Sequence, residues 1–294
     1  MSKIDLNNIA HSYNPNDPNP VYALNPFSMT WENGKRYAIL GPSGCGKTTM
    51  LNIVSGLVRP SAGSILFDDK DVTDLKTESR NIAQVFQFPV IYNTMTVYEN
   101  LAFPLKCRDF PKTKIDERVT SVADTLNLQS FLNAPARKLT ADQKQLISLG
   151  RGLVREDVAA VLMDEPLTVI DPDLKFRLRR KLKEINEEFK TTLVYVTHDQ
   201  NEAMTFADNI IVMSEGEVVQ AGTPKELFER PNTTFVGYFI GSPAMNLFET
   251  EASSDNSVKI NNSIIKTNTD LTSLKNRKIK LGIRSEFIKI AENQ

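Results

Sequence analysis

The 294 residues include 40% hydrophobic and 24% charged side chains, a composition typical of a globular protein with one large domain or two smaller ones. The 35 Lys and Arg residues nearly balance the 36 Asp and Glu residues, which leaves a net charge of −1. This balance excludes the basic surplus typical of a general nucleic-acid binder, so no nucleic-acid partner is expected.

The two cysteines, Cys45 and Cys107, are too few for a disulfide framework, which favours a cytosolic protein. The N-terminal stretch MSKIDLNNIAHSY lacks the apolar centre of a signal peptide, and the apolar run VAAVLM at 158–163 is far too short to cross a membrane. Any role at a membrane is therefore expected to come through a partner protein.

The first part of the chain alternates short β-like runs with turns, from residue 4 to residue 40. The Asn- and Pro-rich segment NPNDPNP at 14–20 predicts an exposed loop, and RYAIL at 36–40 predicts a buried strand. After a glycine-rich turn, TTMLNIVSGL at 48–57 predicts a helix that ends near Gly56. Strand, glycine turn and helix together predict the first half of a βα unit.

A helical region is predicted from about residue 97 to residue 155. Thr96 and Glu99 fit a capping box at its start, and apolar residues recur at helical spacing through KIDERVTSVADTLNL at 114–128. This region is interpreted as a helical insertion into the α/β core.

Two short apolar runs follow, VAAVLMDEP at 158–166 and TTLVYVTHD at 191–199, and each ends in polar residues. An amphipathic helix is predicted between them at 173–189, so the runs are interpreted as strands of a parallel sheet. The basic cluster RLRRKLK in this helix lies opposite its apolar face and predicts a solvated surface.

The C-terminal third begins with a predicted hairpin, IIVMSEGEVVQAG, that turns at Glu215 and Gly216. Short strands from about residue 242 predict a small β-rich appendage. No internal repeat is present in the sequence. The predicted organisation is a first core part at 1–96, a helical part at 97–155, a second core part at 156–240 and the appendage at 241–294.

The segment GPSGCGKT at 41–48 fits the phosphate-loop pattern G-x-x-x-x-G-K-[ST] between a predicted strand and a predicted helix. Glycines let backbone N–H groups turn inward to bind phosphate oxygens. Lys47 adds a positive charge for the β and γ phosphates, Thr48 offers a hydroxyl to Mg²⁺, and the helix N-terminus favours an anion. The alternative, a glycine turn without a ligand, is far less common in this context.

Acidic and imidazole side chains follow the two predicted strands of the parallel sheet. In VLMDEP, Asp164 is predicted on the metal side and Glu165 as the base that polarises the attacking water, although such an acidic pair before proline is also common in simple turns. His198 follows the next strand, where the imidazole could reach the γ-phosphate, although a lone histidine more often satisfies a hydrogen bond near the core.

Together these segments resemble the ATP-binding-cassette ATPases over about residues 1–240, with GPSGCGKTT as Walker A, VLMDE as Walker B and VTHD as the switch-histidine segment. The resemblance implies an α/β P-loop cassette with a helical subdomain, which hydrolyses MgATP. The Walker A residues implied to bind the nucleotide are Gly41, Pro42, Ser43, Gly44, Cys45, Gly46, Lys47, Thr48 and Thr49.

Three further residues take their roles from the resemblance. VFQFP places Gln87 at the Q-loop glutamine, which is implied to act in catalysis and to bind the metal. LTVIDP places Asp171 at the D-loop aspartate, although the residues before it differ from the family pattern. Tyr13 lies where the family stacks an aromatic ring on adenine, and Tyr22 is a weaker alternative.

LTADQ at 139–143 lies where the family has its signature, usually LSGGQ, which completes the nucleotide site of the opposite subunit in a dimer. The resemblance thus implies that Thr140, Asp142 and Gln143 act in trans. From the residues alone, Thr140 and Gln143 predict a capping box with Asp142 in the first helical turn. A carboxylate there repels a γ-phosphate, which suggests pairing with a different ATPase subunit; the alternative is a homodimer in which Asp142 points away.

LGIRSEF at 281–287 resembles the start of the oligosaccharide-binding-like C-terminal domain of carbohydrate-type importer ATPases. LTADQKQ, LTVIDP and FIGSPAMN are most similar to ATPase subunits of glycerol and glycerol-3-phosphate importers. The implied partners are membrane permease subunits near Gln87–Tyr92 and, indirectly, an extracytoplasmic solute-binding protein, at the cytoplasmic face of the membrane. Two alternatives stay open: a weakly hydrolysing regulatory subunit, and a soluble cassette ATPase unconnected with transport.

Overall fold

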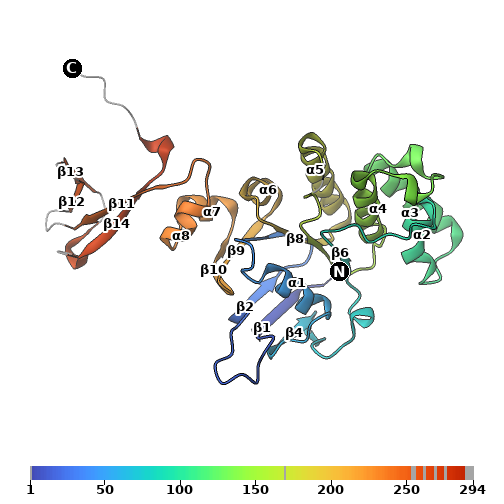
Figure 1. Cartoon of the computed structure of the whole chain (residues 1–294), viewed down its shortest axis with the longest axis horizontal. Coiled ribbons are helices and arrows are strands. Elements are labelled where there is room, and N and C mark those ends of the chain that lie inside the picture. The colour runs from blue at the N-terminus through green and yellow to red at the C-terminus, as the bar shows by residue number, and fades with distance from the viewer. Residues whose placement is uncertain are drawn as a thin grey trace, which may run out of the picture. The chain divides into compact units, whose positions relative to one another are not determined.

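The computed structural model describes residues 2–168, 170–252, 256–260, 263–267, 270–274 and 277–288. The chain divides by its internal contacts into two compact units, Met1–Thr223 and Pro224–Gln294 (Figure 1).

A six-stranded sheet forms the centre of the first unit, in the order β10-β9-β3-β8-β7-β6. Strands β9, β3, β8, β7 and β6 are parallel, and β10 closes the edge as an antiparallel hairpin with β9. The bounds are β3 (Arg36–Leu40), β6 (Ala83–Val85), β7 (Ala160–Asp164), β8 (Thr192–Thr197), β9 (Asn209–Ser214) and β10 (Glu217–Gly222). The hairpin turns at Glu215 and Gly216, both in the left-handed region, which confirms the predicted turn.

Both faces of this sheet are buried, which explains why its strands are continuous apolar runs instead of alternating ones. Along β7, Ala160 and Leu162 pack into one core with the N-terminal strands, whereas Val161 and Met163 pack into a second core with the helical region. The sheet therefore separates two cores and fixes the strand ends between them.

A second sheet of the first unit is antiparallel, in the order β2-β1-β4-β5. Its strands are β1 (Ile4–His11), β2 (Leu24–Trp31), β4 (Ala62–Phe67) and β5 (Lys70–Asp71). The helix α1 (Lys47–Ser55) buries Met50, Leu51 and Ile53 in the same core as this sheet. Gly56 ends α1 with φ 82°, as the sequence predicted.

Three helices form the predicted helical region and pack together on one side of the first unit (Figure 1). They are α2 (Val97–Lys106), α3 (Lys112–Thr125) and α4 (Ala141–Leu153), with short 3-10 turns at Gln129–Phe131 and Ala136–Lys138. The predicted capping box of Thr96 and Glu99 is present at the start of α2. No helix in the described ranges combines the length and apolar character that crossing a membrane requires.

Two more helices complete the first unit, α5 (Pro172–Phe189) and α6 (Gln200–Phe206), together with a 3-10 turn at Thr77–Ser79. The predicted apolar face of α5 is formed by Leu178 and Leu182, which are buried in the core of the helical region. The side chain of Phe189 is outside the described part of the structure.

The second unit contains two short helices and four short strands. These are α7 (Pro224–Glu229), α8 (Thr234–Phe239), β11 (Asn246–Glu251), β12 (Ser257–Ile260), β13 (Ser263–Lys266) and β14 (Lys278–Ile283), with 3-10 turns at Thr272–Leu274 and Ser285–Phe287. Strand β11 pairs with β14 and β12 pairs with β13, both antiparallel.

Arg284 links the two helices of the second unit to its strands. Its guanidinium donates to the carbonyl oxygens of Phe228 at 2.7 Å and Ile240 at 2.5 Å, and it lies over the Phe228 ring. Residues 224–240 group with the β-rich appendage, in agreement with these contacts, whereas the predicted organisation placed them with the core. The four-part division at 96, 155 and 240 otherwise stays a prediction.

Candidate active site

The phosphate-loop segment lies between the end of β3 and the start of α1. Gly44 and Gly46 have φ values of 79° and 101°, a backbone conformation that side chains with a Cβ rarely adopt. A Cβ on Gly41 would lie 2.3 Å from the Met213 carbonyl oxygen, so this position also needs glycine. The loop is therefore shaped by close backbone packing, with its N–H groups next to the N-terminus of α1.

Lys47 is buried inside this loop. Its Nζ donates to the carbonyl oxygens of Gly41 and Pro42, both at 2.8 Å. The neighbouring Cys45 is also buried, and burial raises the pKa of its thiol. A buried ammonium held by backbone carbonyls, beside a helix N-terminus, provides a fixed positive charge for an anionic group.

Asp164 ends β7 and is only 8% exposed. Burial raises the pKa of its carboxyl group above the usual value, and the adjacent Glu165 adds to this, while a hydrogen bond with Thr48 and the charge of Lys47 oppose it. A buried carboxylate next to a hydroxyl offers two oxygen ligands of the kind that Mg²⁺ prefers. These residues therefore fit a bound Mg²⁺.

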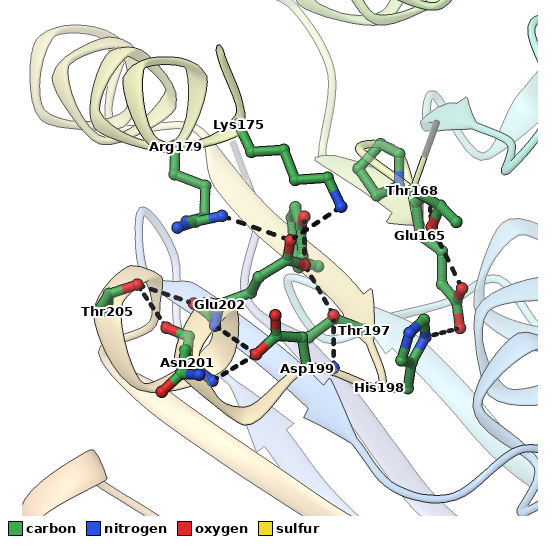
Figure 2. Close-up of polar contacts among 12 residues, drawn as sticks. Glu165, Thr168, Lys175, Arg179, Thr197, His198, Asp199, Asn201, Glu202 and Thr205 are labelled. Atoms are coloured by element: carbon green, nitrogen blue, oxygen red, sulfur yellow. Dashed lines mark hydrogen bonds and ion pairs between the residues drawn. The ribbon is translucent and has the colours of Figure 1, made fainter. Parts of the chain in front are cut away.

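Glu165 directly follows this strand and is held in the left-handed region with φ 44°, a conformation that costs free energy for a residue with a side chain. Its backbone N–H donates to the Val196 carbonyl oxygen at 3.0 Å. The Thr168 hydroxyl donates to the Glu165 backbone carbonyl at 3.0 Å and lies 3.3 Å from carboxylate Oε2 (Figure 2). The turn thus fixes the direction of the carboxylate.

His198 follows the end of β8, and its side chain is 57% exposed. Its Nδ1 lies 3.1 Å from Oε1 of Glu165 (Figure 2). Because β7 and β8 are parallel neighbours, their carboxyl ends bring these two side chains together from residues far apart in sequence. A carboxylate and an imidazole in contact at the edge of a cleft can orient a water molecule and exchange a proton.

An open cleft of about 610 Å³ contains most of the predicted site residues. It is lined by Tyr13, Ala23, Ser43, Gly44, Gly46, Lys47, Thr48, Thr49, Gln87, Glu165, Thr168 and His198. Residues predicted from distant motifs, Tyr13, Gln87 and His198, thus meet the phosphate loop at one cleft of a size suited to a nucleotide.

Tyr13 lies at the exposed edge of this cleft. Its ring is 61% exposed, its hydroxyl is 3.1 Å from Thr49 Oγ1, and it makes an edge contact with the His11 ring. Burial lowers the pKa of His11, so this ring is neutral at physiological pH. An exposed aromatic ring beside the phosphate loop is available for stacking on a base.

Four predicted residues lie at the starts of α4 and α5, outside the cleft lining found in the described residues: Thr140, Asp142, Gln143 and Asp171. Thr140 and Gln143 form a reciprocal capping box on α4, with distances of 3.0 Å and 3.3 Å, which confirms the capping prediction. Asp142 lies in the first turn of α4, and Asp171 caps α5 by accepting from the Asp173 N–H at 3.0 Å. Their roles toward a nucleotide remain predictions.

Gln145 is a site-associated residue that the sequence analysis did not identify. It is fully buried on α4, and its Nε2 donates to the carbonyl oxygens of Phe86 at 3.2 Å and Pro166 at 2.9 Å. It therefore joins the helical region to the residues beside both Gln87 and Glu165. The sequence offered only its place on the buried face of a helix, since both of its partners are backbone atoms of distant loops.

The sequence of this chain matches two known families. Residues 24–168 match the ABC transporter family, and residues 241–288 match the MalK OB fold domain. The chain is 44% identical over 256 residues to the sn-glycerol-3-phosphate import ATP-binding protein UgpC 3 of Agrobacterium fabrum, which covers 87% of this chain and 71% of that protein. It is 39% identical over 292 residues to the UgpC protein of Psychromonas ingrahamii, which covers 99% of this chain and 76% of that protein.

Further similarity extends to a sugar importer subunit and to solved structures. The trehalose/maltose import ATP-binding protein MalK of Thermococcus litoralis is 44% identical over 241 residues, which covers 80% of this chain and 64% of that protein. The structure of cbiO1 from Clostridium perfringens superposes with a TM-score of 0.69 at 28% identity, over 77% of this chain and 90% of that chain. A dimeric ATP-binding cassette with bound ADP and Pi gives a TM-score of 0.68 at 28% identity, over 75% of this chain and 98% of that chain.

Proposed function

Because the chain belongs to the ATP-binding-cassette transporter ATPases, we propose that it hydrolyses MgATP as the energy-coupling subunit of a solute importer. The observation that carries this proposal is the contact between Glu165 and His198 at the cleft that contains the phosphate loop. A base and an imidazole beside a loop for phosphates are the groups that hydrolysis of a γ-phosphate needs.

In the proposed reaction, Glu165 polarises a water molecule, whose oxygen attacks the γ-phosphorus of ATP and whose proton passes to the Glu165 carboxylate. The bond between that phosphorus and the β–γ bridging oxygen breaks, so that ADP and inorganic phosphate leave. His198 holds the carboxylate from one side and Thr168 from the other, which keeps the base in one orientation. Lys47 neutralises negative charge on the phosphates, and Tyr13 stacks on the adenine.

Thr48, Asp164 and Gln87 are the residues proposed to hold Mg²⁺. When bound, the ion supplies positive charge to the phosphate oxygens. The burial of Asp164 supports this assignment, because a cation offsets the cost of an ionised carboxylate in that position. Gln87 lines the same cleft from the loop that follows β6.

The cassette is proposed to act as a dimer with the starts of α4 and α5 facing the nucleotide of the opposite subunit. Thr140, Asp142 and Gln143 would then contact that nucleotide in trans, with Asp171 nearby. Since Asp142 brings a carboxylate toward a γ-phosphate, a dissimilar second ATPase subunit is the favoured partner. The Asp142 carboxylate also favours a second candidate function, a regulatory subunit with weak hydrolysis. The alternative assembly is a homodimer in which Asp142 points away from the nucleotide.

The relatives are named as import ATP-binding proteins for sn-glycerol-3-phosphate and for trehalose/maltose. We propose the same class of solute here: glycerol, glycerol-3-phosphate or a related sugar. Membrane permease subunits would dock at the exposed face of Gln87–Tyr92, at the cytoplasmic side of the membrane, and an extracytoplasmic solute-binding protein would deliver the solute. Uptake of labelled glycerol-3-phosphate into vesicles that contain the assembled importer tests this choice.

The hydrolysis proposal is tested with Glu165→Gln, which keeps the shape of the side chain and removes its basicity. We expect kcat for ATP to fall by about 10²- to 10⁴-fold, while binding of a fluorescent ATP analogue stays within about twofold. The matched control is Glu215→Gln, since Glu215 also has a left-handed backbone, with φ 50°, but lies in the β9–β10 hairpin. Full turnover by the Glu165 variant would refute its assignment as the base.

A further inference from the structure

A buried carboxylate lies directly behind the segment that carries His198. Glu202 on α6 is 7% exposed, and its Oε2 accepts a hydrogen bond from the Thr197 hydroxyl at 2.8 Å (Figure 2). The same oxygen accepts a second hydrogen bond from the Tyr195 hydroxyl at 2.9 Å. Burial of the Tyr195 phenol, together with the adjacent Glu202 carboxylate, raises the pKa of Tyr195 well above its ordinary value, so Tyr195 remains a donor. Glu202 therefore binds two side chains of β8, one of them the residue before His198.

The other oxygen of Glu202 faces α5. Arg179 Nη1 lies 3.4 Å from Oε1, and Lys175 Nζ lies 3.9 Å from the same atom (Figure 2). Both cations are less exposed than an ordinary surface pair, with side-chain exposures of 15% and 25%. An ion pair of this kind is screened less than a surface pair. Glu202 thus joins β8 to the helix that starts at Asp171.

The backbone on both sides of His198 is fixed by the same group of contacts. Thr197 Oγ1 donates to Glu202 and accepts from the Asp199 N–H at 3.0 Å. The Asp199 carboxylate caps α6 by accepting from the Asn201 N–H at 2.7 Å. A hydroxyl has one proton, so when Thr197 donates it to the Glu202 carboxylate, a lone pair of Oγ1 remains to accept from the Asp199 N–H.

The imidazole of His198 itself is more than half exposed, and among the described residues Glu165 is its one side-chain partner. Its position relative to Glu165 therefore depends on the backbone of Thr197–Asp199. Displacement of a catalytic group by about 1 Å can cost about a hundredfold in rate.

We propose that Glu202 is a positioning residue for ATP hydrolysis, which sets the place of His198 through Thr197 and links it to α5 through Arg179 and Lys175. This inference rests on the proposed function. It predicts that a shift of the start of α5, where Asp171 lies, changes the contact between His198 and Glu165. A movement in the ATPase dimer that shifts the start of α5 would thereby also move the imidazole of His198.

The charge of Glu202 and the hydroxyl of Thr197 are tested by separate substitutions. Glu202→Gln keeps an oxygen for Tyr195 and Thr197 but removes the charge that Arg179 and Lys175 face. Thr197→Val keeps the branched shape and removes the hydroxyl. For each variant we expect kcat to fall roughly tenfold or more, with KM for ATP within about twofold, because nucleotide binding does not use these groups.

The control is Arg180→Ala on the same helix. Arg180 pairs with Glu184 at 3.3 Å, and its side chain is 78% exposed, so its loss should leave kcat unchanged. Melting temperatures of all variants are measured in parallel. A loss of kcat that follows melting temperature across the set would indicate a structural role only and would overturn the inference.

A double-mutant cycle with His198→Ala separates positioning from general damage. If Glu202 acts through His198, adding Glu202→Gln to His198→Ala should cause no further loss of single-turnover phosphate release. Independent, multiplicative losses would contradict the inference, and so would full activity of both Glu202→Gln and Thr197→Val. If Glu202→Gln does not fold, the cycle with Thr197→Val decides. A wild-type chain without turnover overturns the proposed function as well, whereas an active wild type with fully active variants overturns this inference alone.

Discussion

Asp164 and Glu165 are adjacent in sequence, but their surroundings differ. Asp164 is 8% exposed at the end of a strand between two cores, and burial raises its pKa. Glu165 turns into the cleft in a left-handed conformation and contacts His198. The end of β7 therefore places the Asp164 carboxyl group in a buried position suited to a cation, and it gives the Glu165 carboxylate an orientation suited to a water molecule in the cleft.

The buried position of Asp164 predicts a conflict between stability and activity. A carboxyl group whose folded-state pKa is raised costs folding free energy wherever it is ionised in the fold, and this cost disappears as the pH falls toward its ordinary value of 3.8. Asp164→Asn should therefore raise the free energy of unfolding at neutral pH by about 0.5–2 kcal/mol without Mg²⁺ or nucleotide. Its Mg²⁺-dependent turnover should fall by about a hundredfold or more.

Urea denaturation at neutral and progressively lower pH measures this effect, and the advantage of the Asn variant should shrink as the pH falls. Asp71→Asn provides a control of opposite sign, because hydrogen bonds from Thr73 lower the pKa of the exposed Asp71. That substitution should not stabilise the protein. An Asp164→Asn variant that is less stable at neutral pH would contradict the argument.

Helix ends and turns that depend on neighbours in sequence were predicted well. The glycine turn between β3 and α1, the end of α1 at Gly56, the β9–β10 turn and the capping boxes at Thr96 and Thr140 all agree with the structure. Each depends on backbone conformation or hydrogen bonds within a few residues, which residue type and spacing can specify.

Other elements and contacts were missed because their partners are distant in sequence. Strand β6 has only three residues, and its pairing with β7 joins segments far apart along the chain. Gln145, Thr168 and Glu202 were not identified either, since their contacts to loop carbonyls or to other side chains exist only after folding. The candidate site was predicted as motifs, whereas the contacts that hold those motifs in place come from tertiary structure.

The capping box at α4 predicts a specific stability change. Thr140→Ala removes the side-chain acceptor for the Gln143 N–H, so the free energy of unfolding should fall by about 1 kcal/mol. Thr125→Ala is the comparison, because the Thr125 hydroxyl donates to the Ser121 carbonyl inside α3 and makes no cap. Denaturant midpoints at constant m-value give both changes. Equal stability of the two variants would mean that the cap contributes little to α4.

Arg284 connects the strands of the second unit to helices that the predicted boundary near residue 240 had separated from them, whereas the structure divides after Thr223. The composition changes near 242, but the guanidinium of Arg284 binds the carbonyl oxygens of Phe228 and Ile240. Burial lowers the pKa of this guanidinium, although an arginine remains charged. The change in composition marks where the strands of the second unit begin. The contacts of Arg284 with Phe228 and Ile240, which connect these strands to α7 and α8, are not visible in the composition.

Asp142 bears on which second ATPase subunit this chain pairs with. A carboxylate in the first turn stabilises α4 through the helix dipole, and the same charge opposes a phosphate at that helix end. If the dimer places this turn against a nucleotide, Asp142→Asn should increase turnover of the chain alone by about fivefold, equivalent to about 1 kcal/mol, with only a small loss of stability. Asp142→Gly should give the same direction of change with a larger loss of stability, since glycine lowers helix propensity.

Turnover is compared for the chain alone and for mixtures with candidate ATPase subunits of the same importer. Glu226→Gln serves as the control, because Glu226 is the first-turn acid of α7 and belongs to neither of the helix starts, those of α4 and α5, that are proposed to face the nucleotide. Activity that requires a dissimilar partner, together with a gain for the Asp142 variants alone, supports an asymmetric dimer in which the phosphate loop of this chain works with an intact signature. Equal activity of wild type and both Asp142 variants without a partner would instead mean that LTADQ is a well-capped helix start in a homodimer, with its carboxylate directed away from the nucleotide.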